Sequence, residues 1–267
     1  MDTTEFSEIV WDYYRHHARE MPWREQPTPY NVVVSEFMLQ QTQVDRARPK
    51  FEAWVSQRPD FASLAAASPE DVLRLWKGLG YNRRALRLHE VAHRVQQEYG
   101  GKLPETVEEL QTFAGIGPGT AGAIAAYALN QPVVFIETNI RRVFLHHFFA
   151  DSDSVADKEL LPIIAAALDR EHPREWYWAL MDYGTFLKSQ VVNPNRRSKH
   201  YTKQAKFEGS HRQLRGLILE QVLQHGSFGV QDGVAGFDQA SIARACSELA
   251  LEGFLEAQED RFTMRKV

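Results

Sequence analysis

The residues of this chain that are best suited to chemistry lie between positions 115 and 142. A glycine-rich turn, Gly115-Ile116-Gly117-Pro118-Gly119, leads into Thr120, and an acid, Glu137, follows 17 residues after that threonine. Glycines let the backbone approach a ligand closely, and the free N–H groups at the start of a helix attract an anion such as a phosphate. A phosphate-binding turn followed by a carboxylate predicts chemistry on DNA.

A second acid, Glu36, stands inside the apolar stretch 31–43. Glutamate is seldom buried without a partner, and burial raises the pKa of its carboxyl, so Glu36 is a candidate proton donor in a pocket. The alternative is a surface glutamate on a helix. The polar residues Gln40, Gln41 and Thr42 follow at once, and their amide and hydroxyl groups suit the edges of bases.

Three further stretches could hold a phosphate backbone. A proline-rich turn at 22–30 carries an arginine next to an indole, Gly78-Leu79-Gly80 opens a helix with adjacent arginines, and residues 193–206 are polar and strongly basic. Each has a structural alternative: a rigid turn, tight packing at a helix junction, and a solvated connector.

The composition describes a globular protein. The chain has 267 residues, 43% of them hydrophobic, which is enough for one large domain or a main domain with a small one. There is no long apolar run and no secretory signal at the N-terminus, so we expect a cytoplasmic protein, associated with the nucleoid if bacterial. The single cysteine, Cys246, excludes an internal disulfide and any multi-cysteine metal site.

The elements that must position these residues are helical in pattern up to position 190. A small-residue helix follows Thr120, and the first helix of the chain ends before Pro22. In the tail, two helical patterns separated by a turn at 226–229, and a final alternating stretch, resemble part of a winged helix. The helices are predicted at 6–18, 48–57, 72–76, 83–99, 140–149, 158–169, 175–187, 213–224 and 239–251.

These segments together resemble the helix–hairpin–helix DNA glycosylase superfamily, specifically its adenine DNA glycosylase (MutY-like) branch. The resemblance covers residues 6 to 190 and is carried by four patches in the family's order and spacing: 22–24, 34–44, 75–81 and 115–124. It implies an all-α, two-lobed fold, to which the tail adds a small winged-helix-like domain. We expect a glycosylase domain at 1–192, a basic linker at 193–209 and a DNA-contacting domain at 210–267.

The resemblance also implies roles. It assigns protonation of the leaving base to Glu36 and stabilisation of the sugar cation to Glu137, with Asn139 beside it in the catalytic set, because breaking an N-glycosidic bond calls for two carboxylates. The partner is double-stranded DNA with a damaged or mispaired base flipped into a pocket, bound by a monomer without a membrane. The residues expected to contact the substrate or DNA are Trp23, Arg24, Gln40, Gln41, Thr42, Leu79, Gly80, Tyr81, Gly115, Gly117, Gly119, Thr120, Arg141, Arg196, Arg197 and Lys199.

Three departures from the family qualify the expected activity. The second acid is normally aspartate, and Glu137 adds one methylene, about 1.5 Å of reach that alters rates. Where bifunctional relatives carry a Schiff-base lysine, this chain has Gly119, so base excision without strand cleavage is expected. The family's four-cysteine iron–sulfur cluster is absent, and the basic run with the tail is expected to replace its contribution. No metal or cofactor is required for the chemistry, although the hairpin offers a place for a structural monovalent or divalent cation.

The leading hypothesis is a monofunctional N-glycosylase that removes adenine opposite 8-oxoguanine or G. Because Glu137 departs from the family, removal of a mismatched or modified pyrimidine, such as T, U or a hydroxymethylated base, stays open. A third reading is a DNA-binding homologue without catalysis.

Overall fold

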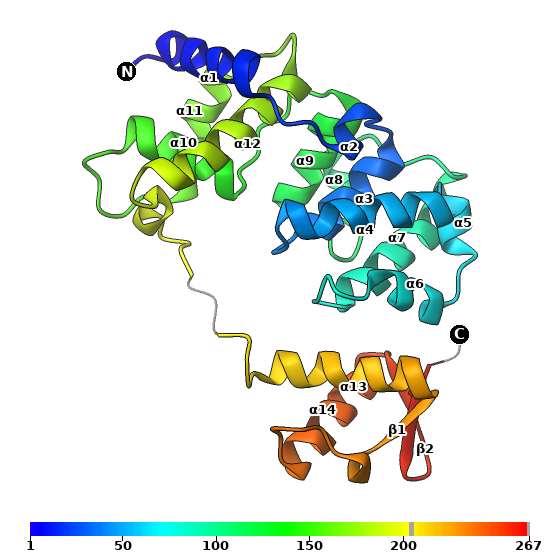
Figure 1. Cartoon of the computed structure of the whole chain (residues 1–267). Coiled ribbons are helices and arrows are strands. Elements are labelled where there is room, and N and C mark those ends of the chain that lie inside the picture. The colour runs from blue at the N-terminus through cyan, green and yellow to red at the C-terminus, as the bar shows by residue number, and fades with distance from the viewer. Residues whose placement is uncertain (203–205, 266–267) are drawn as a thin grey trace. The chain divides into compact units, whose positions relative to one another are not determined.

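A computed structural model describes residues 1–202 and 206–265. The fold is mostly helical, as predicted, with one small sheet near the C-terminus (Figure 1). Contacts divide the chain into two compact units, Met1–Glu36 with Lys102–Lys203 and Phe37–Gly101 with Gln204–Val267. Each unit is therefore assembled from two separate stretches of sequence. The predicted boundaries at 192 and 209 stay a prediction.

The first unit holds both acids. It contains α1, α2, the first part of α3, and the run from α8 to η1. Helix α12 packs against α1, α9 and α10, so it forms the middle of this unit. The bounds are α1 Thr3–His17, α2 Pro22–Glu25, α3 Pro29–Leu39, α8 Val107–Leu110, α9 Pro118–Leu129, α10 Thr138–Phe148, α11 Asp157–Ala167, α12 Pro173–Gln190 and η1 Pro194–Arg197.

The core of the first unit is aromatic. The ring of Phe6 on α1 lies 4.9 Å from that of Phe144 on α10 and 6.1 Å from that of Trp176 on α12, and all three side chains are fully buried. Helix α9 packs closely because its side chains are small. A Cβ on Gly122 would lie 2.4 Å from the Cβ of Phe135, so only glycine allows this contact.

The second unit begins with four helices, α4 Val44–Gln57, α5 Phe61–Ala65, α6 Pro69–Trp76 and α7 Arg83–Tyr99. Local signals set their ends: Ser68 accepts a hydrogen bond from the backbone N–H of Asp71 at the start of α6, and α7 ends at Gly100 in the left-handed conformation. The predicted helix 83–99 matches α7 in both bounds.

The C-terminal module contains α13 His211–His225, β1 Ser227–Gly229, η2 Val230–Asp232, α14 Gln239–Leu251, β2 Leu255–Gln258 and β3 Arg261–Met264. The strands form an antiparallel sheet in the order β1-β3-β2, with Phe262 opposite both Phe228 and Ala257. Two helices packed on each other and on this sheet give the expected winged-helix-like arrangement.

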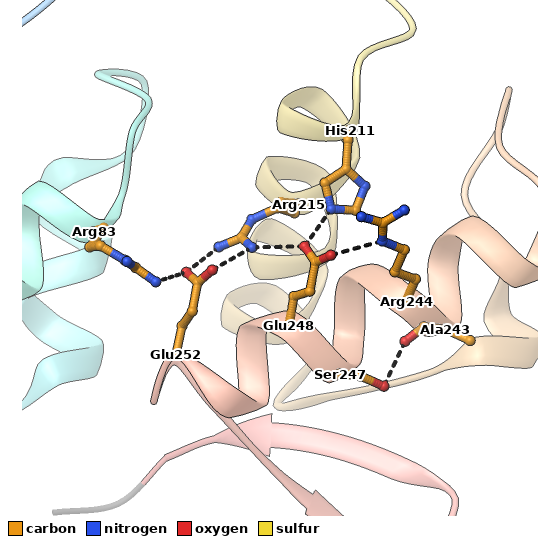
Figure 2. A network of polar contacts seen from close by, with 8 residues as sticks. All are labelled: Arg83, His211, Arg215, Ala243, Arg244, Ser247, Glu248 and Glu252. Carbon is orange, nitrogen blue, oxygen red and sulfur yellow. Dashed lines mark hydrogen bonds and ion pairs between the residues drawn. The ribbon is translucent and has the colours of Figure 1, made fainter.

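Ion pairs on the helices hold this module together (Figure 2). The carboxylate of Glu248 on α14 accepts hydrogen bonds from His211 and Arg215 on α13 and from Arg244 on its own helix, at 2.6, 3.2 and 2.9 Å. Glu252 accepts from Arg215 at 2.8 Å. It also pairs at 2.7 Å with Arg83 at the start of α7, so the module is tied to the helices of its own unit.

Two stretches differ from the sequence-based prediction, at 22–30 and at 227–229. The predicted turn at 22–30 contains the short helix α2. Pro22 is its first residue, a position at which the backbone N–H that proline lacks would make no hydrogen bond within the helix. Residues 227–229, predicted as a turn, pair with β3. The apolar run 132–136 is extended and lies against α9, and it pairs with no strand among the described residues. Within the described ranges, no helix is long and apolar enough to cross a membrane.

Candidate active site

The glycine turn connects α8 to α9 as a helix–hairpin–helix. Gly115 has φ +90°, which favours glycine, and Gly117 is the residue that precedes the first turn of α9. Both are exposed, whereas Ile116 between them is 3% exposed and anchors the turn in the core. The turn before α9 is therefore held at the surface by a buried anchor, and a phosphate site at the start of a helix requires such an arrangement.

Glu137 begins α10. Its carboxylate oxygen Oε1 accepts hydrogen bonds from the backbone N–H groups of Asn139 and Ile140, the latter at 2.8 Å. Burial raises the pKa of this carboxyl, and the two N–H groups together with Arg142 and Arg141 oppose that rise. Both of these hydrogen bonds go to the same carboxylate oxygen, Oε1.

Glu36 lies on α3 in the same unit. The pKa of its carboxyl is raised to about 8, mainly by burial and also by the negative charge of Glu137, while Arg24 opposes the rise. Glu36 has little compensating hydrogen bonding of the kind that Glu137 receives from its helix. The two carboxyl groups are thus neighbours with different environments, and Glu36 is the one held protonated at neutral pH.

Arg24 is fixed by a buried carboxylate. Its two terminal nitrogens donate to the two oxygens of Asp182 at 2.8 and 2.9 Å, and its guanidinium lies 5.4 Å from the centre of the Trp178 ring. The Asp182 side chain is fully buried and also accepts a hydrogen bond from Arg19 at 2.6 Å. With two arginines on it, Asp182 serves as an anchor for Arg24.

Asn139 is fixed by Arg142. The Arg142 guanidinium donates to the side-chain oxygen of Asn139 and, at 2.7 Å, to the carbonyl of Gly184 on α12. A Cβ on Gly184 would lie 2.7 Å from the Cβ of Asn139, so glycine permits the close crossing of α10 and α12. The asparagine amide therefore has a set orientation two residues after Glu137.

Tyr127 completes this group, although no sequence motif marks it as a site residue. It is 6% exposed on α9, and its hydroxyl is a buried polar atom without a hydrogen-bond partner among the described residues. The charges of Glu36 and Glu137 raise the pKa of its phenol further beyond the rise that burial causes. A tyrosine in a helix of alanines resembles core packing in the sequence, which is why no pattern pointed to it.

The first unit thus brings together a cluster of catalytic candidates and their supports, which we call the acid cluster: Glu36, Glu137, Asn139, Tyr127, Arg24, Asp182 and Arg142. Gly119 lies close to the backbone next to the acid cluster. An ideal Cβ on it would stand 3.1 Å from the carbonyl oxygen of Ile136, the residue before Glu137. Trp23, 6% exposed, is buried in the same unit.

The second unit holds the polar loop predicted to lie at the damaged pair, and Arg84 on α7 organises it. The Arg84 guanidinium donates to the carbonyls of Phe37, Met38 and Gln40 and to the hydroxyl of Thr42, at 3.0 Å in the last case. It also donates to the carbonyls of Leu79 and Gly80 at 3.3 and 3.0 Å. Arg84 therefore joins the 40–42 loop to the 78–81 turn, a role that no local pattern announced.

The remaining predicted contacts have varied surroundings. The guanidinium of Arg141 makes two hydrogen bonds to Asp157, and that of Arg197 donates to carbonyls at the end of α10, among them Phe149. Tyr81 accepts a hydrogen bond from Arg212 of α13 at 2.6 Å. Arg196, Lys199 and Gln41 are exposed. Residues 203–205 of the predicted basic run lie outside the described ranges. Assignment of all these residues to DNA stays a prediction.

Comparison with known proteins places this arrangement in a family. Residues 34–163, which include both acids, match the HhH-GPD superfamily of base excision DNA repair proteins. The adenine DNA glycosylase of Mycolicibacterium smegmatis is 34% identical over 274 residues, 94% of this chain and 93% of that protein. That of Homo sapiens is 34% identical over 238 residues, 85% of this chain and 42% of the human protein. The chain belongs to the adenine DNA glycosylase family.

Solved structures agree with this family at the level of the fold. A thermostable thymine-DNA glycosylase, 20% identical, superposes with a TM-score of 0.61 over 68% of this chain and 85% of that one. Endonuclease III in a non-covalent DNA complex, 13% identical, gives a TM-score of 0.57 over 78% and 91%. The predicted family and helix–hairpin–helix glycosylase fold are confirmed.

An iron–sulfur cluster of the four-cysteine kind does not fit this family member. The chain has one cysteine, and Cys246 is buried on α14, where burial raises the pKa of its thiol to about 11. Cluster ligation needs several thiolates together. In the region after α12, buried Asn195 of η1 donates to the carbonyl of Thr138 at 3.1 Å. Among the described residues no group of three metal-ligating side chains occurs.

Proposed function

We propose that this protein is a monofunctional DNA N-glycosylase that hydrolyses the bond between adenine and deoxyribose. The observation that carries the proposal is the pair of neighbouring carboxyl groups with different environments, Glu36 with a pKa near 8 and Glu137 held by backbone N–H groups. The relatives named adenine DNA glycosylases support adenine as the base. DNA is the partner that the family and the exposed hairpin support.

The chemistry follows from the two environments. Glu36 gives its proton to a ring nitrogen of the base while the glycosidic bond breaks and its electron pair leaves with the base. Positive charge then develops on the sugar, where the carboxylate of Glu137 stabilises it electrostatically. A water molecule adds to the sugar carbon and gives its proton to Glu137. The products are free adenine and an abasic site, so atoms and charge balance.

Base removal without strand cleavage is the second part of the proposal. Strand cleavage by a bifunctional glycosylase needs an amine that attacks the sugar, and Gly119 supplies no side chain at the corresponding position. The close approach of Gly119 to the carbonyl of Ile136 also leaves little room for a longer residue there.

The opposing base is proposed as 8-oxoguanine or G, in double-stranded DNA bound by a monomer. Glu137 favours a second candidate, removal of a mismatched pyrimidine such as T or U, because its extra methylene changes the distance from the backbone to the sugar.

A panel of duplexes tests the function. Single-turnover incubation with A:8-oxoG, A:G, T:G, U:G and hydroxymethylated pyrimidine duplexes, followed by alkali, reveals abasic sites; samples without alkali reveal strand cleavage. We expect excision from the adenine duplexes and cleavage only after alkali. Excision from T:G or U:G alone would support the pyrimidine candidate, and no excision from any duplex would support a DNA-binding protein without catalysis.

The Glu137→Gln variant tests the assignment of the second acid. The substitution keeps the side-chain length and an oxygen for the N–H groups of α10 but removes the negative charge. We expect excision to fall at least a hundredfold with DNA affinity unchanged. Retained activity would contradict the role of Glu137.

A further inference from the structure

We propose that Tyr127 is a positioning residue for the acid: its phenol donates a hydrogen bond to the carboxylate that Glu36 becomes when it protonates the leaving base. The inference rests on the proposed function and extends it to a residue outside the expected catalytic set. The phenol keeps its own proton throughout, so no additional acid, base or oxidant is involved.

The first observation is the state of the hydroxyl. Tyr127 is 6% exposed, and its oxygen is buried with no hydrogen-bond partner in the described residues. A buried hydroxyl without a partner destabilises a protein, and such groups are uncommon in folded chains. Phenylalanine would fill the same space without that cost, so the hydroxyl is explained by a state of the site in which an acceptor is present.

The second observation is the direction available to the ring. Gly119, Ala123 and Tyr127 succeed one another at intervals of four along α9, and therefore form one row on its surface. Long side chains in helices lean toward the N-terminus of their own helix. Nothing larger than a methyl group precedes Tyr127 in this row. The phenol thus leans toward the end of α9 that lies against Ile136, the neighbour of Glu137.

The ring itself is confined. Its centre lies 6.3 Å from the ring of Trp178, in a stacked arrangement, and 6.3 Å from that of Phe135, edge to face. The backbone carbonyl of Tyr127 accepts a hydrogen bond from Arg174 of α12, which fixes this turn of α9 to the helix that carries Trp178. A confined ring loses little entropy when its hydroxyl donates a hydrogen bond.

The charged and titratable groups around the phenol come from four elements. Glu36 on α3 and Glu137 at the start of α10 interact with it most strongly among the charges, and Arg24 on α2 and Tyr177 on α12 also contribute. Burial and the two carboxylates raise its pKa well above the ordinary value, so the phenol stays protonated at neutral pH. It is therefore a donor to whichever of the two acids is ionised and short of donors. Glu137 already receives two N–H groups, which leaves Glu36 after proton transfer.

The Tyr127→Phe variant, with Tyr177→Phe as its matched control, tests the proposal. Both changes remove one buried phenolic hydroxyl from the same unit, but Tyr177 donates at 2.7 Å to the carbonyl of Val133. Single-turnover excision from an A:G duplex is measured between pH 5 and 10. For Tyr127→Phe we expect a rate about tenfold lower at pH 7 and a falling limb shifted upward by about one pH unit, because Glu36 loses a donor to its ionised form. For Tyr177→Phe we expect the falling limb of the pH–rate profile at the same pH as in the unaltered protein.

A second measurement needs no substrate. Carbon-13 NMR of the glutamate carboxyls in the free, full-length protein, with the Glu36 signal identified by its loss in Glu36→Gln, gives the pKa of Glu36. We expect it higher in Tyr127→Phe than in the unaltered protein and unchanged in Tyr177→Phe. Should the protein excise no adenine, the proposed function fails while this measurement still tests Tyr127. An unchanged Glu36 pKa, or a slower rate with an unmoved limb, would overturn the role of Tyr127.

Discussion

Glutamates in the two compact units are held in opposite ways. In the acid cluster, burial raises the pKa of Glu36 to about 8 and that of Glu137 in the same direction. In the C-terminal module, hydrogen bonds from His211 and Arg244 hold the pKa of Glu248 at about 2, and Arg215 lowers that of Glu252 (Figure 2). Glutamate thus becomes a proton donor in catalysis where it is buried with few hydrogen-bond donors around it. It stays a permanent anion where hydrogen-bond donors surround it.

The same contrast separates supports from reactive groups inside the acid cluster. Asp182 is as buried as any acid of the chain, yet two arginines bind it and hold Arg24 in place. Glu36, with fewer partners, keeps a proton to give. Burial alone therefore does not mark a catalytic acid; burial combined with a shortage of donors does. Four pairwise comparisons of variants test this contrast, in decreasing order of expected effect.

Glu36→Gln gives the largest effect. The substitution removes the proton donor and retains the shape, so we expect single-turnover excision of adenine to fall about a thousandfold or more, with DNA affinity within about twofold of the unaltered protein. Glu248→Gln, the same chemical change in the ionised network, should leave the rate within about twofold. Equal losses in the two variants would remove the distinction between the two kinds of glutamate.

Asp182→Asn tests the anchor. One buried carboxylate is lost and two arginines are left without their charge partner, so we expect the free energy of unfolding to fall by about 3–5 kcal/mol, measured by urea titration. Arg215→Gln breaks the partly exposed network instead, and the expected loss there is about 1 kcal/mol, decreasing at high salt. A loss at Asp182 no larger than that at Arg215 would contradict the anchoring role.

Stability against pH separates the two environments next. For Glu36 the pKa in the folded state, about 8, exceeds its ordinary value of 4.5, so stability falls as the pH rises from 4.5 to 8. Glu36→Gln removes that fall, and we expect it to be about 2 kcal/mol more stable than the unaltered protein at pH 8 and equal to it at pH 4.

The sign is reversed for Glu248. Its pKa is lowered from 4.5 to about 2 in the folded state, so its contribution is present above pH 4.5 and is lost as the pH falls toward 2. Glu248→Gln should therefore be less stable than the unaltered protein at neutral pH, with the difference vanishing in acid. Thermal melts at several pH values measure both variants.

The smallest effect concerns the two tyrosines. Because the hydroxyl of Tyr127 has no partner in the described structure, Tyr127→Phe should change the free energy of unfolding by less than about 0.5 kcal/mol or raise it. Tyr177→Phe loses a buried hydrogen bond and should cost about 1–2 kcal/mol. The reverse order would show that Tyr127 is bonded within the resting protein.

Sequence reasoning found what local chemistry determines. The hydroxyl of Ser68 marks the start of a helix, and the missing side chain of Gly100 marks the end of another. The hairpin glycines and Glu36 stand in sequence motifs that resemble those of the family, so they could be recognised from the sequence. The roles of the supporting residues could not be predicted, because each depends on a partner far away in the chain: Arg24 was selected as a DNA contact, and its pairing with Asp182 was not foreseen. Arg24 and Asp182 are 158 residues apart, and Arg84 reaches a loop more than 40 residues before it.

The sequence also could not decide between two roles that suit the same residue type. Arg197 has the composition of a phosphate contact, yet in the structure its guanidinium lies on carbonyls at the end of α10. Tyr127 has the composition of core packing, yet its hydroxyl lies near two acids. Neither choice follows from residue type, since both depend on which groups the fold brings within reach.

The close approach of Gly119 to the carbonyl of Ile136 has a consequence for how this chain is compared with others. An added methyl group would stand 3.1 Å from that oxygen, a tight contact that requires the backbone at Ile136 to shift slightly. The absent side chain thus permits the close approach of α9 to the residue before the acid, and the additional methylene of Glu137 extends from the next residue. In an alignment, Gly119 and Glu137 would count as two separate differences, whereas in three dimensions the two positions meet through the backbone of Ile136.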